Sequence, residues 1–170
     1  FFVIGQNAVD HPGLVRSILA AGHELGSHSY THPNMGAISD QRSELELTAT
    51  QRALEAITGR SIRLFRPPYN ADAEPRSDEE VRPVIVANRM GYLVAGETID
   101  PNDWNLERKQ PDGTLHHLTP QDIVNGVLQQ IKNGNAILLH DSGGNRAVTV
   151  AALDLLIPRL EALGYHFVTM

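Results

Sequence analysis

The sequence predicts an α/β fold made of parallel β/α units. Short apolar segments alternate with segments of helical periodicity along the whole chain, the order that strand–helix–strand connections produce. Most of these apolar segments are hydrophobic at every position, as strands are when helices cover both faces of a parallel sheet. This pattern fits a doubly wound sheet or a β/α barrel, and in both folds functional side chains gather at the carboxyl ends of the strands. Without an internal repeat or a domain boundary, the chain is expected to form one domain over 1–170.

The first two expected strands flank a helix. Residues 1–4 form a continuous apolar run that Gly5 is expected to end. Asp10 can cap the helix that follows, with Pro12 in its first turn. The alternating segment 23–27 is expected to form the second strand.

The clearest helix lies in the middle of the chain. Ser39 or Asp40 begins it, leucines recur at helical spacing, and Gly59 ends it. Pro67 and Pro68 then break a short strand. Residues 62–65 are expected to form this strand and 74–80 a polar loop. A helix over 81–90 and a strand over 92–95 are expected to follow.

Proline residues mark the helices of the last third. Thr119 and Pro120 supply a cap and a first-turn proline for a helix through Ile131, and Pro158 is expected to kink the last helix. A long polar loop is expected over 105–118 and a fully apolar strand over 136–139. The last helix is expected over 148–163 and a final strand over 166–170.

The composition excludes several classes of protein. The 170 residues include 14 Lys and Arg against 20 Asp and Glu, a formal net charge of −6, which argues against binding to nucleic acid or to anionic membranes. The absence of cysteine excludes disulfides, thiolate metal sites and cysteine nucleophiles, and it suits an extracytoplasmic compartment. No segment reaches the roughly 20 apolar residues of a membrane helix. No serine-hydrolase elbow, dinucleotide-binding motif or P-loop occurs.

Two histidines after the second expected strand are candidate metal ligands. His28 and His32 are four residues apart, so one helical turn would place both imidazoles on the same side, where they could share a metal ion. The alternative is a pair of exposed histidines. Two imidazoles also leave a catalytic zinc site one protein ligand short, because such sites use three.

A proline-stiffened turn follows the third expected strand. In the segment Arg66-Pro67-Pro68-Tyr69, the two prolines could hold the Tyr69 amide as a fixed hydrogen-bond donor to an oxyanion. The alternative is a proline turn that ends a strand, with Arg66 solvated.

Two further polar segments follow later strands. Asp103 and Trp104 come after 92–95, where the indole could line a sugar groove or plug the edge of the core. His140 follows Leu138 at the end of an apolar strand, where it could be a general acid or a core histidine. A nearby carboxylate such as Asp103 would favour its protonated form. The histidines that fit no constellation are expected to be surface or structural, at 11, 23, 116, 117 and 166.

In this order, the four motifs resemble those of the polysaccharide deacetylase family, carbohydrate esterase family 4. They are His-Ser-x-x-His, Arg-x-Pro-Tyr, Asp-x-x-Asp-Trp and Leu-x-His-Asp. The resemblance implies a distorted β/α barrel and metal-dependent removal of acetyl groups from amino sugars in polymers. It implies a divalent metal, zinc by default with cobalt, manganese or nickel as options.

The resemblance also assigns roles to residues of this chain. It implies that His28 and His32 are metal ligands and that His140 is the general acid that protonates the leaving amine. The Tyr69 amide would stabilise the oxyanion, and Arg66 would orient the catalytic base. The remaining roles would be the tuning of His140 by Asp103, and substrate contacts from Pro67, Tyr69, Trp104 and Leu138.

One family motif is absent. The family's Thr-Phe-Asp-Asp-Gly carries the catalytic base and the third metal ligand, and no Asp-Asp pair occurs in this sequence. We therefore expect an N-terminally incomplete catalytic domain over 1–170 whose barrel lacks its first strand. An upstream segment would exist as a removed part or a separate chain, and the sequence shows no signal peptide. For this reason we expect the chain alone to be inactive.

Two segments resemble a particular branch of the family, at 65–75 and 96–104. They are similar to deacetylase domains joined to a membrane family 2 glycosyltransferase. This implies a bacterial cell-envelope polysaccharide that contains N-acetylglucosamine, such as a chitin-like polymer, peptidoglycan or an exopolysaccharide. The alternatives are an O-deacetylase, such as an acetyl-xylan esterase, and an inactive carbohydrate-binding relic.

Overall fold

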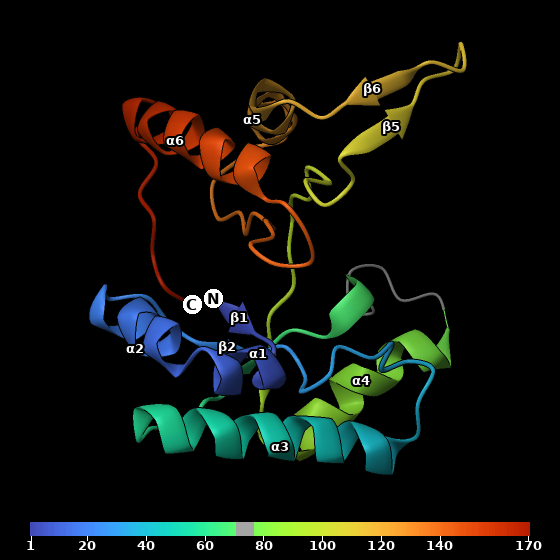
Figure 1. The fold of residues 1–170 in the computed structure, drawn as a ribbon, viewed down its shortest axis with the longest axis vertical. Coiled ribbons are helices and arrows are strands. Elements are labelled where there is room, and N and C mark those ends of the chain that lie inside the picture. The colour runs from blue at the N-terminus through green and yellow to red at the C-terminus, as the bar shows by residue number, and fades with distance from the viewer. Residues whose placement is uncertain (71–76) are drawn as a thin grey trace. The chain divides into compact units, whose positions relative to one another are not determined.

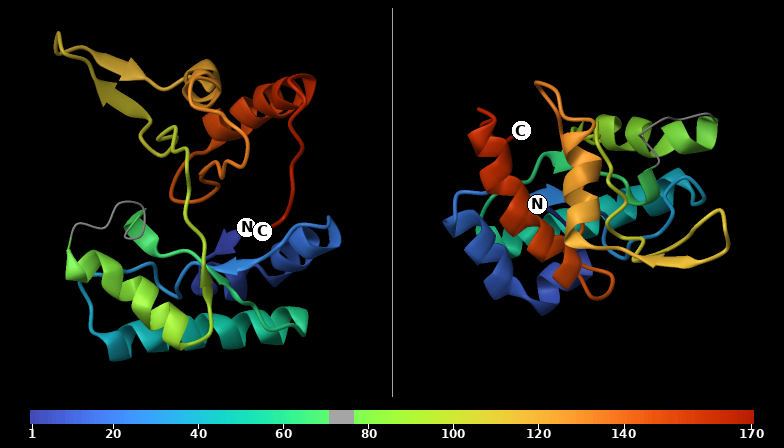
Figure 2. Two further views of the ribbon diagram at one scale, coloured as in Figure 1. Left: turned by 180° about the vertical axis from the view of Figure 1, so that it is seen from behind. Right: turned by 90° about the horizontal axis from the view of Figure 1, so that it is seen from above.

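The computed structural model describes residues 1–70 and 77–170. The chain divides into two compact units, each described by itself below (Figures 1 and 2). Unit 1 contains Phe1–Gly96 with Thr169–Met170, and unit 2 contains Glu97–Val168. The prediction of one catalytic domain over 1–170 stays a prediction. None of the described helices is both long and apolar enough to cross a membrane.

Unit 1 is built on a parallel sheet of four strands in the order β1-β2-β3-β4. The strands are β1 Phe2–Val3, β2 Gly26–Ser27, β3 Leu64–Phe65 and β4 Leu93–Val94. In register, Val3 lies opposite Ser27, Ser27 opposite Phe65, and Phe65 opposite Val94. The predicted parallel α/β fold is confirmed, and the described sheet is open.

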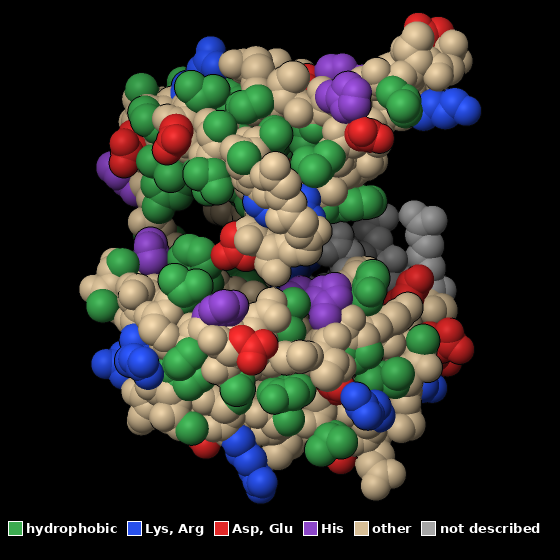
Figure 3. Space-filling model, viewed as in Figure 1, with side chains coloured by type: hydrophobic (Ala, Val, Ile, Leu, Met, Phe, Trp, Pro, Cys, Tyr) green, Lys and Arg blue, Asp and Glu red, His purple; other side chains and the backbone are tan. Residues whose placement is uncertain are grey.

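Helices cover the sheet of unit 1 (Figure 1). They are α1 Gly5–Asp10, α2 Pro12–Ala20, α3 Asp40–Thr58, the 3₁₀ helix η1 Pro68–Asn70 and α4 Asp78–Arg89. Phe65 is fully buried against Leu47 of α3 and Val86 of α4, so these two helices lie on one face of the sheet. On the face of unit 1 seen in Figure 3, hydrophobic side chains are scattered among charged ones, as is usual for a hydrated surface.

The predicted central helix is confirmed at both ends. The Ser39 hydroxyl accepts a hydrogen bond from the Arg42 amide at 3.2 Å, as an N-cap does. Gly59 ends the helix in the left-handed region, at φ 71°, where glycine carries no Cβ penalty.

Three expectations for unit 1 were wrong. Gly5 begins α1 instead of ending a strand, and Asp10 is the last residue of α1 rather than the cap of α2. Tertiary bonds explain this, because the first amides of α1 donate to carbonyls of a distant loop. The expected loop over 74–80 is helical from Asp78, with Ser77 as its N-cap and three acidic residues in the first turn, while 74–76 lie outside the described residues.

Unit 2 consists of two packed helices and a hairpin. The helices are α5 Pro120–Leu128 and α6 Ala147–Ala162, and the strands are β5 Glu107–Lys109 and β6 Leu115–His117. Ile123 and Val127 of α5 share a core with Leu156 and Leu160 of α6. Figure 2 shows the hairpin projecting from these helices.

Three expectations for the chain after Gly96 were wrong. The loop expected over 105–118 contains the antiparallel hairpin, whose turn has Asp112 and Gly113, with Gly113 at φ 87°. The strand expected over 136–139 is reduced to one parallel bridge, between Ile99 and Ile137. Residues 166–170 form no strand. Helix α5 confirms its predicted start, since Thr119 and Asp122 form a capping box.

Candidate active site

His28 directly follows β2 and its ring is held by the backbone of the next strand. The His28 Nδ1 lies 2.8 Å from the carbonyl oxygen of Arg66. A carbonyl oxygen can only accept, so Nδ1 must carry a proton, and in the neutral imidazole Nε2 is then the nitrogen without one. A histidine whose Nδ1 donates to a carbonyl in this way is oriented as metal-ligating histidines are.

The rings of His28 and His32 are in contact. Their centroids are 4.9 Å apart and their planes are inclined by 68°. Residues 28–32 do not form a helical turn. Ser29 and His32 adopt left-handed backbone conformations, at φ 63° and 59°, and the Ser29 hydroxyl accepts a hydrogen bond from the His32 amide at 3.0 Å. The two imidazoles therefore meet through a tight, irregular loop.

Glu46 of α3, which the sequence analysis missed, supports this loop. Its Oε2 accepts hydrogen bonds from the amides of Tyr30 and Thr31, at 2.8 and 2.7 Å. Its Oε1 accepts from the Thr31 hydroxyl at 2.8 Å and from Arg42 at 2.7 Å. Burial raises the pKa of Glu46, but the bonds from Thr31, Arg42 and Tyr30 outweigh it and hold that pKa below its ordinary value. A sequence signal for Glu46 exists in α3. Ser43, Leu47 and Thr50 recur at helical spacing on its buried face, and Glu46 lies on that same face.

Arg66 and Tyr69 lie at the end of β3. The Arg66 side chain is buried, 4% exposed, and its Nη1 donates to the carbonyl of Ala95 at 3.3 Å, so the solvated alternative is wrong. Pro67 is buried beside it. Tyr69 has φ 63° and a side chain that is 66% exposed, with its ring 5.0 Å from that of His32. Unit 1 therefore brings His28, His32 and Tyr69 together.

Asp103 and His140 form the polar centre of unit 2. Asp103 is fully buried, and its Oδ1 lies 2.7 Å from the Nδ1 of His140. Its Oδ2 accepts from the His140 amide at 2.9 Å and from the Thr149 hydroxyl at 2.8 Å. Burial raises the pKa of Asp103, but the bonds from His140 and Thr149 outweigh it and lower that pKa. The carboxylate is therefore ionised and keeps the proton of His140 on Nδ1.

The other two predicted residues of unit 2 adjoin this pair in sequence. Trp104 is 52% exposed, which does not fit a plug at the core edge, and its carbonyl accepts a hydrogen bond from Arg146 at 3.3 Å. Leu138 is half-buried, and its amide donates to the carbonyl of Ile99 at 2.9 Å.

The residues fit part of a metal site. His28 and His32 supply two imidazoles in contact, and the His28 tautomer suits a ligand. Within 1–70 and 77–170, no group of three His, Asp or Glu side chains could hold one metal ion. The described residues therefore provide two of the three protein ligands that a catalytic zinc site uses.

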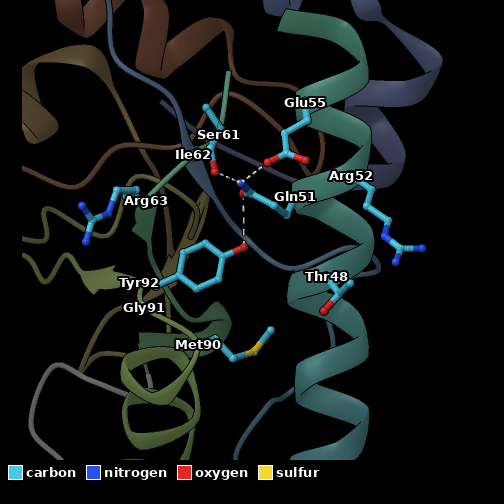
Figure 4. A pocket seen from close by; sticks show the side chains of 10 residues that line it. All are labelled: Thr48, Gln51, Arg52, Glu55, Ser61, Ile62, Arg63, Met90, Gly91 and Tyr92. Carbon is cyan, nitrogen blue, oxygen red and sulfur yellow. Dashed lines mark hydrogen bonds between the residues drawn. The ribbon is translucent and has the colours of Figure 1, made fainter. Parts of the chain in front are cut away.

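A pocket of about 420 Å³ also occurs in unit 1 (Figure 4). It lies where β3 and β4 begin, the end of the strands opposite to His28 and Arg66. Gln51 donates to Glu55 at 2.9 Å and accepts from the Tyr92 hydroxyl at 3.3 Å, so the polar groups at its centre satisfy one another. Arg52 and Arg63 point away from it in Figure 4. This end of a β/α fold serves stability more often than chemistry.

Comparisons with known proteins agree with the motifs. Residues 1–94 match the family model described as polysaccharide deacetylase. A chitooligosaccharide deacetylase of Azorhizobium caulinodans is 30% identical over 97% of this chain and 76% of its own length. The crystal structure of a peptidoglycan N-acetylglucosamine deacetylase superimposes with a TM-score of 0.83 at 28% identity, covering 100% of this chain and 72% of that one.

Another similar structure is that of a pseudoenzyme, so the fold alone does not imply catalytic activity. A family 4 pseudoenzyme of Bacillus anthracis superimposes with a TM-score of 0.78 at 29% identity, over 97% of this chain and 51% of that one. Its similarity extends the shared fold to both units, beyond the residues that the family model matches. The motifs, the fold and the relatives agree, and the chain belongs to the polysaccharide deacetylase family.

Proposed function

We propose that this protein is a metal-dependent hydrolase that removes N-acetyl groups from N-acetylglucosamine-containing oligosaccharides or polysaccharides. The observation that carries the proposal is the loop 28–32, which brings two imidazoles together, with the His28 Nδ1 held by the Arg66 carbonyl. The deacetylase similarities favour N-acetylglucosamine polymers as the substrate class.

His28 and His32 would hold the divalent metal, for which zinc is the default. When bound, the metal lowers the pKa of water and polarises the acetyl carbonyl. Two imidazoles leave this site one ligand short, so we propose that an Asp-Asp pair in a segment outside this sequence supplies the third ligand and the base. Arg66 would orient that base.

The other residues would act on the substrate. His140 would protonate the leaving amine from Nε2, while Asp103 keeps Nδ1 protonated and faces the positive charge of the imidazolium. The Tyr69 amide would donate to the developing oxyanion. Trp104 would contact the sugar and Leu138 the acetyl methyl, whereas Pro67 is buried and would act only through the turn before Tyr69.

Acetate release tests this function. The whole protein loaded with zinc should release acetate from chitin oligosaccharides or peptidoglycan, a strong chelator should abolish the release, and added zinc should restore it. Acetylated xylan is the control substrate that separates N- from O-deacetylation. Failure of the zinc-loaded protein on all N-acetylated substrates would contradict the proposal.

A second candidate is an inactive carbohydrate-binding relic. It is favoured by the two-ligand site of the described residues and by the similar pseudoenzyme. A relic would bind chitin oligosaccharides without taking up metal, so equilibrium dialysis against zinc separates the two candidates.

The site of action would be the bacterial cell envelope, because relatives and structural neighbours include enzymes of peptidoglycan. A fused membrane glycosyltransferase domain stays a prediction. Of the segments that suggested it, residues 71–75 lie outside the described residues.

A further inference from the structure

The loop that carries both candidate ligands, residues 28–32, has a strained backbone and one hydrogen bond of its own, from the His32 amide to the Ser29 hydroxyl. Ser29 and His32 both lie in the left-handed region, at φ 63° and 59°. Such conformations are unfavourable for residues with a Cβ, and they persist only when surrounding contacts enforce them. Groups outside the loop therefore help to set the relative position of the two imidazoles.

One side of the loop is held through its carbonyls. The amides of Gly5 and Gln6, at the start of α1, donate to the carbonyls of Ser29 and Tyr30 at 2.9 and 3.1 Å. These bonds satisfy amides that have no partner inside the helix.

The other side is held through its amides, by one side chain. Glu46 accepts from the amides of Tyr30 and Thr31, which lie between the two histidines. It also accepts from the Thr31 hydroxyl and is paired with Arg42, whose side chain is half-exposed. The Glu46 side chain is only 2% exposed, so water cannot readily replace these bonds. Charge-assisted hydrogen bonds of this kind are about twice as strong as neutral ones.

We propose that Glu46 is a positioning residue for the metal site: it touches no ligand atom, yet it sets the metal affinity of His28 and His32 by holding the backbone between them. This inference rests on the proposed function for the identity of the two histidines as ligands. A glutamine at this position would keep the shape but present an amide NH₂ to donors, so one side of the loop would lose its acceptor.

The test compares Glu46→Gln with Glu44→Gln in the whole protein. Glu44 is exposed on the same helix, so its substitution removes an equal charge without touching the loop. Calorimetric titration with zinc chloride should show affinity weakened about 10-fold to 100-fold by Glu46→Gln, as for other groups that orient metal ligands. Glu44→Gln should bind zinc like the wild type. The visible spectrum of the cobalt form should change only in Glu46→Gln, and equal affinities in both variants would overturn the proposal.

Thr31→Val keeps the proposal testable if Glu46→Gln does not fold. It removes a single donor to the same carboxylate and keeps both backbone amides. Zinc affinity should fall by about threefold, the smaller loss expected when one hydrogen bond is removed. If Glu46→Gln does not fold and Thr31→Val binds zinc with the affinity of the wild type, the inference is overturned, because Glu46 would then act on stability alone.

Failure of the proposed function gives a different result. If the wild type binds zinc but releases no acetate, the deacetylase function fails while the affinity ratio between the Glu46 and Glu44 variants still decides this inference. If the wild type releases acetate without binding zinc, the inference about Glu46 is overturned and the deacetylase activity stands.

Discussion

Each unit contains a histidine whose Nδ1 is held by a single acceptor, but the two acceptors differ in charge. In unit 1, the His28 Nδ1 donates to a neutral backbone carbonyl at 2.8 Å. In unit 2, the His140 Nδ1 donates at 2.7 Å to the ionised, fully buried carboxylate of Asp103. In the neutral imidazole, both contacts select the tautomer that carries its proton on Nδ1.

The charge of the acceptor separates the roles proposed for the two histidines. A metal ligand must stay neutral, and a carbonyl adds no charge that would favour the imidazolium. A general acid must carry a second proton, and a buried carboxylate stabilises that charged state. The same ring contact therefore suits a ligand in one unit and an acid in the other.

The largest effects should come from replacing the histidines themselves. His140→Asn should lower kcat by about 10³-fold, the range for loss of a general acid, while zinc affinity stays at the wild-type value. His28→Asn should lower both kcat and the affinity for zinc. Steady-state kinetics and zinc titration of each variant check this, and loss of zinc binding in His140→Asn would remove the distinction between the two histidines.

Replacing the Asp103 carboxylate by a neutral amide should leave His140, like His28, with an uncharged acceptor at Nδ1. Asp103→Asn should lower kcat by about 10²-fold or more, because the amide can stabilise the wrong tautomer and no longer faces a positive charge. Asp154→Asn is the matched control, since Asp154 is exposed on α6. A kcat for Asp103→Asn equal to that of the control would show that the carboxylate's charge is unimportant.

The stability that Asp103 contributes should depend on pH. The pKa of Asp103 is lowered from its ordinary 3.8, so ionisation stabilises the folded state above about pH 4, and this contribution is lost as the pH falls through the lowered value. The difference in unfolding free energy between wild type and Asp103→Asn should be about 2 kcal/mol at pH 7. It should shrink at pH 3. Urea titrations at both pH values measure it, and a constant difference would argue that Asp103 acts through packing.

The smallest effects should come from the helix caps. Ser39→Ala at α3 and Thr119→Ala at α5 should each cost about 1 kcal/mol of unfolding free energy. Thr119→Ala should cost more, because Thr119 and Asp122 cap each other reciprocally and Ser39 has no such partner in its first turn. Thermal unfolding of both variants checks the order, and a larger loss for Ser39→Ala would contradict it.

The sequence predicted the features that depend on local chemistry. The cap at Ser39, the stop at Gly59 and the start at Thr119 follow from neighbouring residues and were confirmed. The placement of polar motifs after strands also held for His28 and Arg66, which follow β2 and β3. These signals lie within a few residues of the feature they specify.

Features set by distant contacts could not be predicted in this way. Glu46 reaches the loop from 15 and 16 residues along the chain, and the His28 ring is held by a carbonyl 38 residues away. The apolar run at 136–139 forms a single bridge, since its partner segment soon reaches Pro101, which has no amide to donate. The hydrophobicity of a segment alone does not show whether the neighbouring segment has the amides to continue the hydrogen bonds of a β-sheet.

The start of α1 places an evolutionary constraint on three positions at once. A Cβ on Gly5 would lie 2.4 Å from the Tyr30 ring and 2.8 Å from the Thr50 hydroxyl. A larger residue at position 5 would push Tyr30 outward, and the carbonyls of the histidine loop would lose the amides that hold them. Relatives with a larger side chain here should therefore carry a smaller one at the position of Tyr30 or Thr50. Substitutions at these three sites should covary, although only Tyr30 lies within a histidine motif in the sequence.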